Sequence, residues 1–371
     1  MLEIFLAEII LLNKLENKSI EFSSSIYEWY KQFGRKDLPW RKKVTPYRVW
    51  ISEVMLQQTQ VKTVIPFYTK WFIRFPSIES VAVSNIDELL KLWEGLGYYS
   101  RCVNFHKSCK ILFNKYDSQL PENEADFLKL PGVGNYISSA VYSIVKNLPL
   151  TAIDANIKRI MCRVLKIKYL TPYNNKRINN AVEKFIDKDR PGDFNQALMD
   201  LGSSICTPIK TDCYICPISS LCKAMKTSSP LQYPYKKPKR IKPLKRLAAA
   251  IIFNKDKFFI VKRPLNTMLG GLWELPTIEL NTYISPNDQL FKYIKMTYNI
   301  TVSINRKITT IKHSYSHFDI SINLYKCNLQ DNNLINSEFA SWIKPDDIKH
   351  YAFSKSNHKL FNKLNLNAWN I

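Results

Sequence analysis

The chain has 371 residues, of which 46% are hydrophobic and 13% aromatic, so it is not a disordered protein and has room for two or three packed domains. Its 54 lysines and arginines exceed its 31 aspartates and glutamates by 23. This charge favours a polyanionic partner, above all nucleic acid, although a composition biased by codon usage is an alternative source of part of it.

Residues 1–22 form an apolar N-terminal extension that we expect to be an extra helix. They contain Glu3 and Glu8, lack a basic start and a small-residue cleavage site, and their apolar run is too short for a bilayer. No later stretch is long and apolar enough to span one. The sequence therefore predicts a protein of the cytoplasm, at the nucleoid if the source is bacterial, with no membrane partner.

Residues 23–226 show helical spacing of apolar residues throughout. We expect one helix from a serine N-cap at residues 23–25 to Gly34, and another through residues 49–75 that carries Glu53 among apolar neighbours. Burial would raise the pKa of the Glu53 carboxyl and make it an acid near neutral pH. A surface glutamate on an amphipathic helix is the alternative.

A first glycine turn follows a helix predicted over residues 85–93. Gly95 and Gly97 flank Leu96, and Tyr98 comes next. A turn that presents an aromatic ring suits stacking on nucleobases. A helix–helix turn with tyrosines in the core is the alternative.

A second glycine turn, LPGVGNY, connects a helix predicted over residues 121–130 to the helix ISSAVYSIVKN. Gly132 and Gly134 are two of only nine glycines, so each one answers a backbone need, and such a turn before a helix exposes N–H groups to a phosphate. Asp154 then precedes an amphipathic helix, where it can be a functional carboxylate or an ordinary N-cap. A helix over FNQALMDLGSSIC leads to the cysteines.

Four of the eight cysteines lie within seventeen residues, in the pattern Cys-x6-Cys-x2-Cys-x5-Cys. They are Cys206, Cys213, Cys216 and Cys222. In an intracellular protein a disulfide framework is not expected. Four thiolates on one loop hold either a zinc ion or a [4Fe–4S] cluster. Zinc ribbons usually use two Cys-x2-Cys pairs far apart and this loop has one, so we expect the cluster.

Residues 227–247 are a basic, proline-rich linker that suits a phosphate track or serves only as a tether. Residues 248–371 then alternate as strands do, with helices predicted over residues 287–296 and 355–364. The sequence predicts a multidomain protein, with an all-α domain over residues 23–226 and an α+β domain after the linker.

Residues 23–226 resemble the helix-hairpin-helix DNA glycosylase superfamily. LPGVGNY matches its hairpin, IDANIKRI carries its aspartate, and the cysteines match its iron–sulfur loop over residues 206–222. SEVMLQQTQV, GLGYYSR and FNQALMDLG are similar to the MutY-type adenine DNA glycosylases. The resemblance implies a monomeric enzyme of base excision repair that acts on duplex DNA with A:8-oxoguanine or A:G mispairs.

The resemblance also implies how the base is removed. Glu53 would protonate adenine at N7, and ionised Asp154 would stabilise the oxocarbenium-like sugar or capture it. Tyr136 and Asn156 would position this pair. The endonuclease III-like branch has a Schiff-base lysine where this chain has Tyr136, so the enzyme would not cut the strand.

One departure from the family pattern is Ala155, where a glycine is common, and alanine would cost roughly 1 kcal/mol if that position required positive φ. To reach the base, the enzyme would flip it out of the helix. In this first domain the residues expected to contact DNA are Arg41, Gln58, Leu96, Tyr98, Gly132, Val133 and Gly134.

The C-terminal part resembles the Nudix-like domain of MutY-type enzymes, through GGLWELP and the closing segment from Ser341. The stretch over residues 288–300 lacks the glutamate cluster that a pyrophosphatase needs for Mg²⁺, so we expect a recognition domain. Tyr315, Ser316 and His317 match a family segment that reads 8-oxoguanine and usually ends Phe-Ser-His.

Two other classes of protein remain as alternatives. An endonuclease III-type glycosylase and lyase is disfavoured by Tyr136 and by the added domain. The other is a non-catalytic DNA-binding protein with a zinc module, in which Glu53 and Asp154 would have no chemical role.

Overall fold

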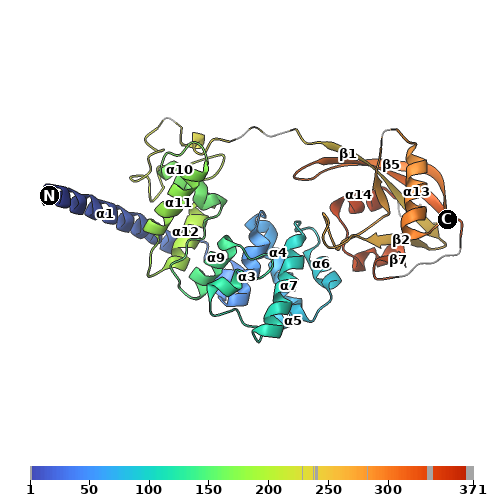
Figure 1. Ribbon diagram of the computed structural model, residues 1–371, viewed down its shortest axis with the longest axis horizontal. Helices are drawn as coiled ribbons and strands as arrows, with labels where there is room; N and C mark the ends of the chain where they lie inside the picture. The colour runs from blue at the N-terminus through green and yellow to red at the C-terminus, as the bar shows by residue number, and fades with distance from the viewer. Residues whose placement is uncertain are drawn as a thin grey trace. The chain divides into compact units, whose positions relative to one another are not determined.

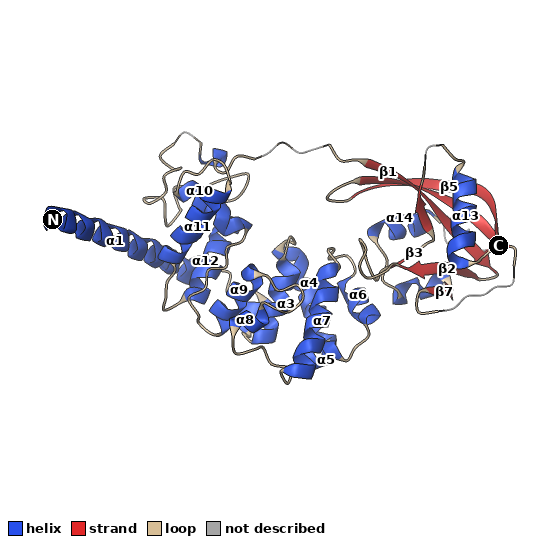
Figure 2. Ribbon diagram, viewed as in Figure 1, coloured by secondary structure: helices blue, strands red, loops and turns tan. Residues whose placement is uncertain are grey.

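The structure is a computed structural model that describes residues 2–227, 229–236, 238, 241–281, 283–331 and 337–364, with side chains from residue 17 onward. The chain divides into two compact units, Met1–Glu79 with Ser108–Pro238, and Ser80–Lys107 with Lys239–Ile371. All named strands belong to the second unit, and the first is built from helices (Figures 1 and 2). None of the helices in the described part is long and apolar enough to cross a membrane.

Helices α5 (Ile78–Ala82) and α7 (Ser100–Lys115) run across the division, and α6 (Ile86–Trp93) belongs to the second unit. The helices of the first unit are α1 (Leu2–Phe33), α2 (Pro39–Lys42), α3 (Pro46–Leu56), α4 (Val61–Arg74), α8 (Glu124–Phe127), α9 (Asn135–Val145), α10 (Ala155–Val164), α11 (Pro172–Phe185), α12 (Pro191–Ser204) and the short η1 (Pro230–Gln232).

The expected helix start at the serines of residues 23–25 is wrong, because α1 is continuous from Leu2 to Phe33. Ser23 Oγ donates to the carbonyl of Ser19 at 3.1 Å, and Ser24 Oγ to that of Ile20 at 2.7 Å. These hydroxyls bond back along the helix instead of capping it. The predicted end at Gly34 is right, and a Cβ there would collide with the Tyr30 ring.

The single helix expected over residues 49–75 is also wrong. Helix α3 ends at Leu56 and α4 begins at Val61. Between them Gln58 adopts a left-handed conformation with φ +56°, which ends the helix without glycine. The helix expected over residues 121–130 is reduced to the single turn α8.

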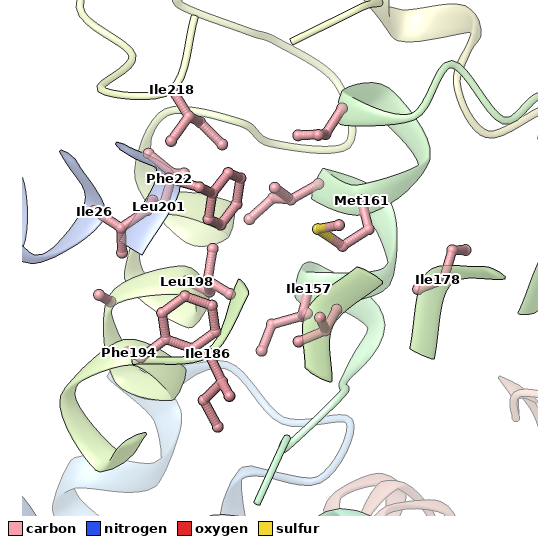
Figure 3. Packing of buried hydrophobic residues seen from close by; sticks show 14 of the residues in the cluster. Phe22, Ile26, Ile157, Met161, Ile178, Ile186, Phe194, Leu198, Leu201 and Ile218 are labelled. Atoms are coloured by element: carbon pink, nitrogen blue, oxygen red, sulfur yellow. The ribbon is translucent and has the colours of Figure 1, made fainter. Parts of the chain in front are cut away.

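The buried core of Figure 3 joins α1, α10, α11, α12 and the cysteine loop. Phe22 of α1 stacks on Phe185 of α11 with ring centroids 4.5 Å apart, and Ile218 of the cysteine loop lies in the same core. Burying each such side chain contributes about 1.5–3 kcal/mol. This packing fixes α10, and with it Asp154 at its head, against α12.

Among its described residues the second unit contains a seven-stranded sheet, in which β1 pairs parallel with β6 and antiparallel with β2 and β4. Strand β5 pairs antiparallel with β6 through two register shifts. The strands are β1 (Leu244–Asn254), β2 (Lys257–Lys262), β3 (Trp273–Glu274), β4 (Thr277–Glu279), β5 (Val302–Ser314), β6 (Asp319–Leu329) and β7 (Ala340–Ile343).

Alternation along β1 places helices on both faces of the sheet. Ala249 and Ile251 share a core with α14 (Lys355–Lys363), whereas Ala250 and Ile252 share one with α13 (Pro286–Tyr298). A short η2 (Pro345–His350) precedes α14. Both predicted helices and the predicted α+β class are confirmed.

Candidate active site

A cavity of about 890 Å³ in the first unit is lined by all four residues predicted to be catalytic. Glu53 comes from α3, Tyr136 from α9, and Asp154 and Asn156 from the head of α10. These segments are far apart in the sequence, so the fold is what brings two carboxyls, a phenol and an amide to one space.

Glu53 occupies the buried face of α3, a helix that begins at Pro46 after the N-cap Thr45. Its side chain is 5% exposed, and Oε2 accepts a hydrogen bond of 2.6 Å from the Tyr136 hydroxyl. Burial raises the pKa of Glu53 and outweighs the opposing effects of Tyr136 and Arg41. The surface alternative for this residue is therefore wrong.

Tyr136 is the second residue of α9 and is placed by the glycine hairpin. Gly132 has φ +79°, and Ser108 Oγ donates to the carbonyl of Pro131 at 2.8 Å. Gly134 is the N-cap in an extended conformation with open space where a Cβ would lie, so the expected backbone need is confirmed for Gly132 and wrong for Gly134. Burial and the nearby carboxyls raise the pKa of Tyr136 well above its usual value, so the phenol stays neutral and donates. A proton carried by Glu53 would then sit on Oε1, because Oε2 already accepts from Tyr136.

Asp154 is the N-cap of α10 and also lines the cavity. The N-cap interpretation is confirmed, and a functional role for the carboxylate stays a prediction. Oδ1 accepts from the backbone N–H of Ile157 at 2.7 Å, and Oδ2 from Asn156 Nδ2 at 2.7 Å. Burial raises the pKa of Asp154 despite these bonds. Ala155 is the first helical residue without positive φ, so alanine carries no strain there.

Asn156 is itself fixed by groups that the sequence analysis missed. Its Oδ1 accepts from Arg159 Nη2 at 3.0 Å, and Arg159 also donates to the carbonyls of Gly202 and Cys206 at 2.6 and 3.0 Å. A Cβ on Gly202 would lie 2.7 Å from the Asn156 Cβ. Glycine at this position of α12 therefore leaves room for Asn156 beside Asp154.

The four clustered cysteines line a second, smaller cavity, next to α10. Arg163 Nη1 lies 3.0 Å from Cys206 Sγ, which suits a thiolate at that position. Throughout the described residues, no three histidine, cysteine, aspartate or glutamate side chains group closely enough to hold one metal ion.

The residues of the first unit predicted to contact DNA have different environments. Gln58 is exposed in its left-handed turn, and Gly132 and Gly134 are exposed, whereas Val133 is buried. Arg41 is mostly buried, with 9% of its side chain exposed, and its guanidinium is bound to Asp200. The contacts of these residues with DNA stay predictions.

In the second unit, Tyr98 and Ser316 lie together. The Tyr98 hydroxyl is 3.1 Å from Ser316 Oγ, and Tyr98 is 41% exposed with φ +49°, a conformation rare for a bulky residue. The hydroxyl of Tyr315 is 2.9 Å from Ser356 Oγ, and His317 is exposed. Leu96 is buried.

Sequence reasoning also missed Glu94 and Asp200. Glu94 accepts from the backbone N–H of Phe353 at 2.9 Å and lies 2.6 Å from His358 Nε2. Asp200 is 1% exposed and binds Arg35 and Arg41. An acid among apolar residues in FNQALMDLG was a visible signal for Asp200, but its partners are about 160 residues away in the chain.

Comparison with known proteins gives two matching families. The model of the HhH-GPD superfamily of base excision DNA repair proteins matches residues 51–190, and that of the NUDIX domain matches residues 248–363. The solved structure of a thermostable thymine-DNA glycosylase covers 58% of this chain and 98% of its own, with TM-score 0.53 and 29% identity. An endonuclease III–DNA complex, 20% identical with TM-score 0.50, shares the fold.

Several curated relatives carry one name, adenine DNA glycosylase. The protein of Buchnera aphidicola subsp. Baizongia pistaciae is 38% identical over 306 residues, which cover 82% of this chain and 85% of the relative. The protein of Schizosaccharomyces pombe is 31% identical, in an alignment that covers 89% of this chain and 86% of the relative. The human protein is 27% identical, in an alignment that covers 92% of this chain and 73% of the relative. The chain therefore belongs to the adenine DNA glycosylase family and is an enzyme that excises adenine from DNA in base excision repair.

Proposed function

We propose that this enzyme removes adenine paired with 8-oxoguanine or guanine in duplex DNA, with Glu53 as the acid and Asp154 as the carboxylate that stabilises the sugar. The observation that carries the proposal is the pairing of two carboxyls on one cavity, buried Glu53 and partly buried Asp154, each with its own hydrogen-bond partners. Two carboxyls in different environments suit an acid and an ion.

The acid step follows from the hydrogen bond between Tyr136 and Glu53. Adenine leaves poorly as an anion, so a proton on its N7 lowers the barrier to breaking the N-glycosidic bond. With Oε2 occupied by Tyr136, Oε1 of Glu53 is free to carry that proton toward the base. Burial keeps the carboxyl protonated closer to neutral pH.

The second step uses the ionised form of Asp154. Bond cleavage leaves positive charge on C1′ and the ring oxygen, and a fixed carboxylate stabilises it or captures C1′ before water attacks. The bonds from Ile157 and Asn156 hold that carboxylate and favour its ionised form. With Tyr136 in place of a Schiff-base lysine, base removal leaves an abasic site and an uncut strand.

The target base must leave the duplex to enter this cavity. We propose that Gln58 and Tyr98 enter the base stack when the adenine leaves it. Both residues occupy left-handed turns that present a polar or an aromatic side chain to solvent. Ser316, within reach of Tyr98, would bond the N7–H and O8 edge of 8-oxoguanine, supported by His317 and Tyr315. The C-terminal domain would then recognise the lesion without hydrolase activity, since α13 contains no glutamate.

Single-turnover excision from matched duplexes tests the mispair specificity. We expect adenine release to be fastest opposite 8-oxoguanine, slower opposite guanine and slowest opposite thymine, because only the lesion offers the altered edge to Ser316. Equal rates opposite 8-oxoguanine and thymine would contradict the assigned specificity.

The cysteine loop fits a [4Fe–4S] cluster held by Cys206, Cys213, Cys216 and Cys222. All four line one cavity, and Arg163 beside Cys206 would offset the negative charge of a thiolate-bound cluster. When bound, the cluster would hold the loop in place against α10.

We expect purified protein to be brown, with an absorption band at about 400 nm and close to four irons per chain. Cys213→Ser should reduce both the band and the iron content, whereas Cys327→Ser, a buried cysteine of the second unit, should leave them unchanged. A colourless protein with stoichiometric zinc would overturn the assignment.

A further inference from the structure

Asp200 is a buried carboxylate beside the active-site cavity that the mechanism above does not use. It lies on α12, with 2% of its side chain exposed. It accepts from the backbone N–H, Nε and Nη2 of Arg35 at 2.9, 2.8 and 2.5 Å, and from Nη1 and Nη2 of Arg41 at 2.6 and 3.1 Å. The Asp200 carboxylate therefore binds both Arg35 and Arg41.

Arg41 is the member of this cluster that concerns Glu53. It lines the same cavity as Glu53, and its charge favours the ionised form of that carboxyl. Its guanidinium lies 5.7 Å from the centre of the Tyr30 ring, and both of its Nη atoms donate to Asp200. A cation beside the acid would promote loss of the proton that the acid must donate, unless its charge is offset.

We propose that Asp200 is a positioning residue that ties the guanidinium of Arg41 to α12 and offsets its charge, so that Glu53 stays protonated at the pH of catalysis. This proposal rests on the proposed role of Glu53 as the acid. Without the Asp200 carboxylate, Arg41 would carry an uncompensated charge and be free to pair with Glu53.

Asp200 is suited to this task because it stays ionised. Burial alone would raise its pKa, but the hydrogen bonds and charges of Arg41 and Arg35 outweigh burial and hold the pKa below its usual range. Other charged and titratable groups also line the cavity and influence the protonation of Glu53. They are Tyr27, Tyr30, Lys31, Arg35, Lys36, Arg41, Lys62, Tyr136, Asp154 and Asp193.

The test is the pH profile of single-turnover adenine excision, in which the rate falls at high pH as Glu53 loses its proton. In Asp200→Asn we expect this alkaline limb to move roughly 1–3 pH units lower, with recovery of the rate at lower pH. Asp193→Asn is the matched control, since it removes the same charge from α12 next to the same cavity without a hydrogen bond to Arg41. The alkaline limb of the Asp193→Asn profile should move much less than that of Asp200→Asn.

Arg41→Gln supplies a second variant that remains informative if Asp200→Asn does not fold. Removing the cation should move the alkaline limb to higher pH, and combining it with Asp200→Asn should return the limb toward the wild-type position. A uniformly lower rate in Asp200→Asn with an unmoved limb, or an unmoved limb in Arg41→Gln, would overturn the proposal. If the limb persists in Glu53→Gln, the role of Glu53 itself fails instead.

Discussion

Asp154→Asn should abolish adenine release, with a loss on the order of 10³-fold or more in the single-turnover rate. Asparagine can still accept the Ile157 N–H and cap α10, so the helix and the fold should persist. The substitution removes the negative charge that we propose stabilises the developing positive charge on the sugar. A loss of that size corresponds to about 4 kcal/mol of transition-state stabilisation.

Binding separates a chemical role of Asp154 from a structural one. The variant should still bind an A:8-oxoguanine duplex with near wild-type affinity, measured by titration of labelled DNA. Asp288→Asn, which removes an exposed aspartate from the first turn of α13, should retain full activity. Full activity in Asp154→Asn would refute the assigned role.

Glu53→Gln should reduce the excision rate by about 10²- to 10⁴-fold, the contribution typical of a positioned general acid. Glutamine has the same shape and keeps an acceptor for the Tyr136 hydroxyl, so the cavity should be preserved. It has no acidic proton for the departing base. Exposed Glu79 of α5 offers a matched control, and Glu79→Gln should behave as wild type.

The pH profile of the same variant gives a second check. The wild-type rate should fall at low pH as Asp154 is protonated and at high pH as Glu53 is ionised, and burial raises the pKa of both carboxyls. Both limbs should therefore lie at higher pH than for exposed carboxyls. Glu53→Gln should lose the alkaline limb and keep the acidic one, and an unchanged profile would show that another group supplies the proton.

The sequence was sufficient to identify the four candidate residues that line this cavity because each stands in a short local motif, and their chemical roles stay predictions. The hairpin glycines stand immediately before Tyr136, and Asp154 stands immediately before an amphipathic helix, so each motif has its own pattern. The change from helical spacing to strand alternation after residue 247 likewise predicted the α+β domain and its two helices, whereas the placement of α13 and α14 on opposite faces of the sheet comes from the structure.

Features that depend on distant residues or on rare backbone conformations could not be predicted. The break between α3 and α4 contains neither glycine nor proline, and only the left-handed φ of Gln58 marks it. The role of Asp200 is visible only from its hydrogen bonds to Arg35 and Arg41, which lie 165 and 159 residues earlier in the chain. Likewise Glu94 binds Phe353 and His358, which belong to the same unit of the fold but lie about 260 residues later in the chain.

The most direct measurement of the central claim is the fate of a duplex with adenine opposite 8-oxoguanine. Free adenine and strand breaks would be quantified with and without alkali, beside duplexes that carry A:T or thymine glycol. We predict adenine release from the mispair, with breaks only after alkali, because Tyr136 cannot form a Schiff base. Strand cleavage without alkali, or no release of adenine, would contradict it.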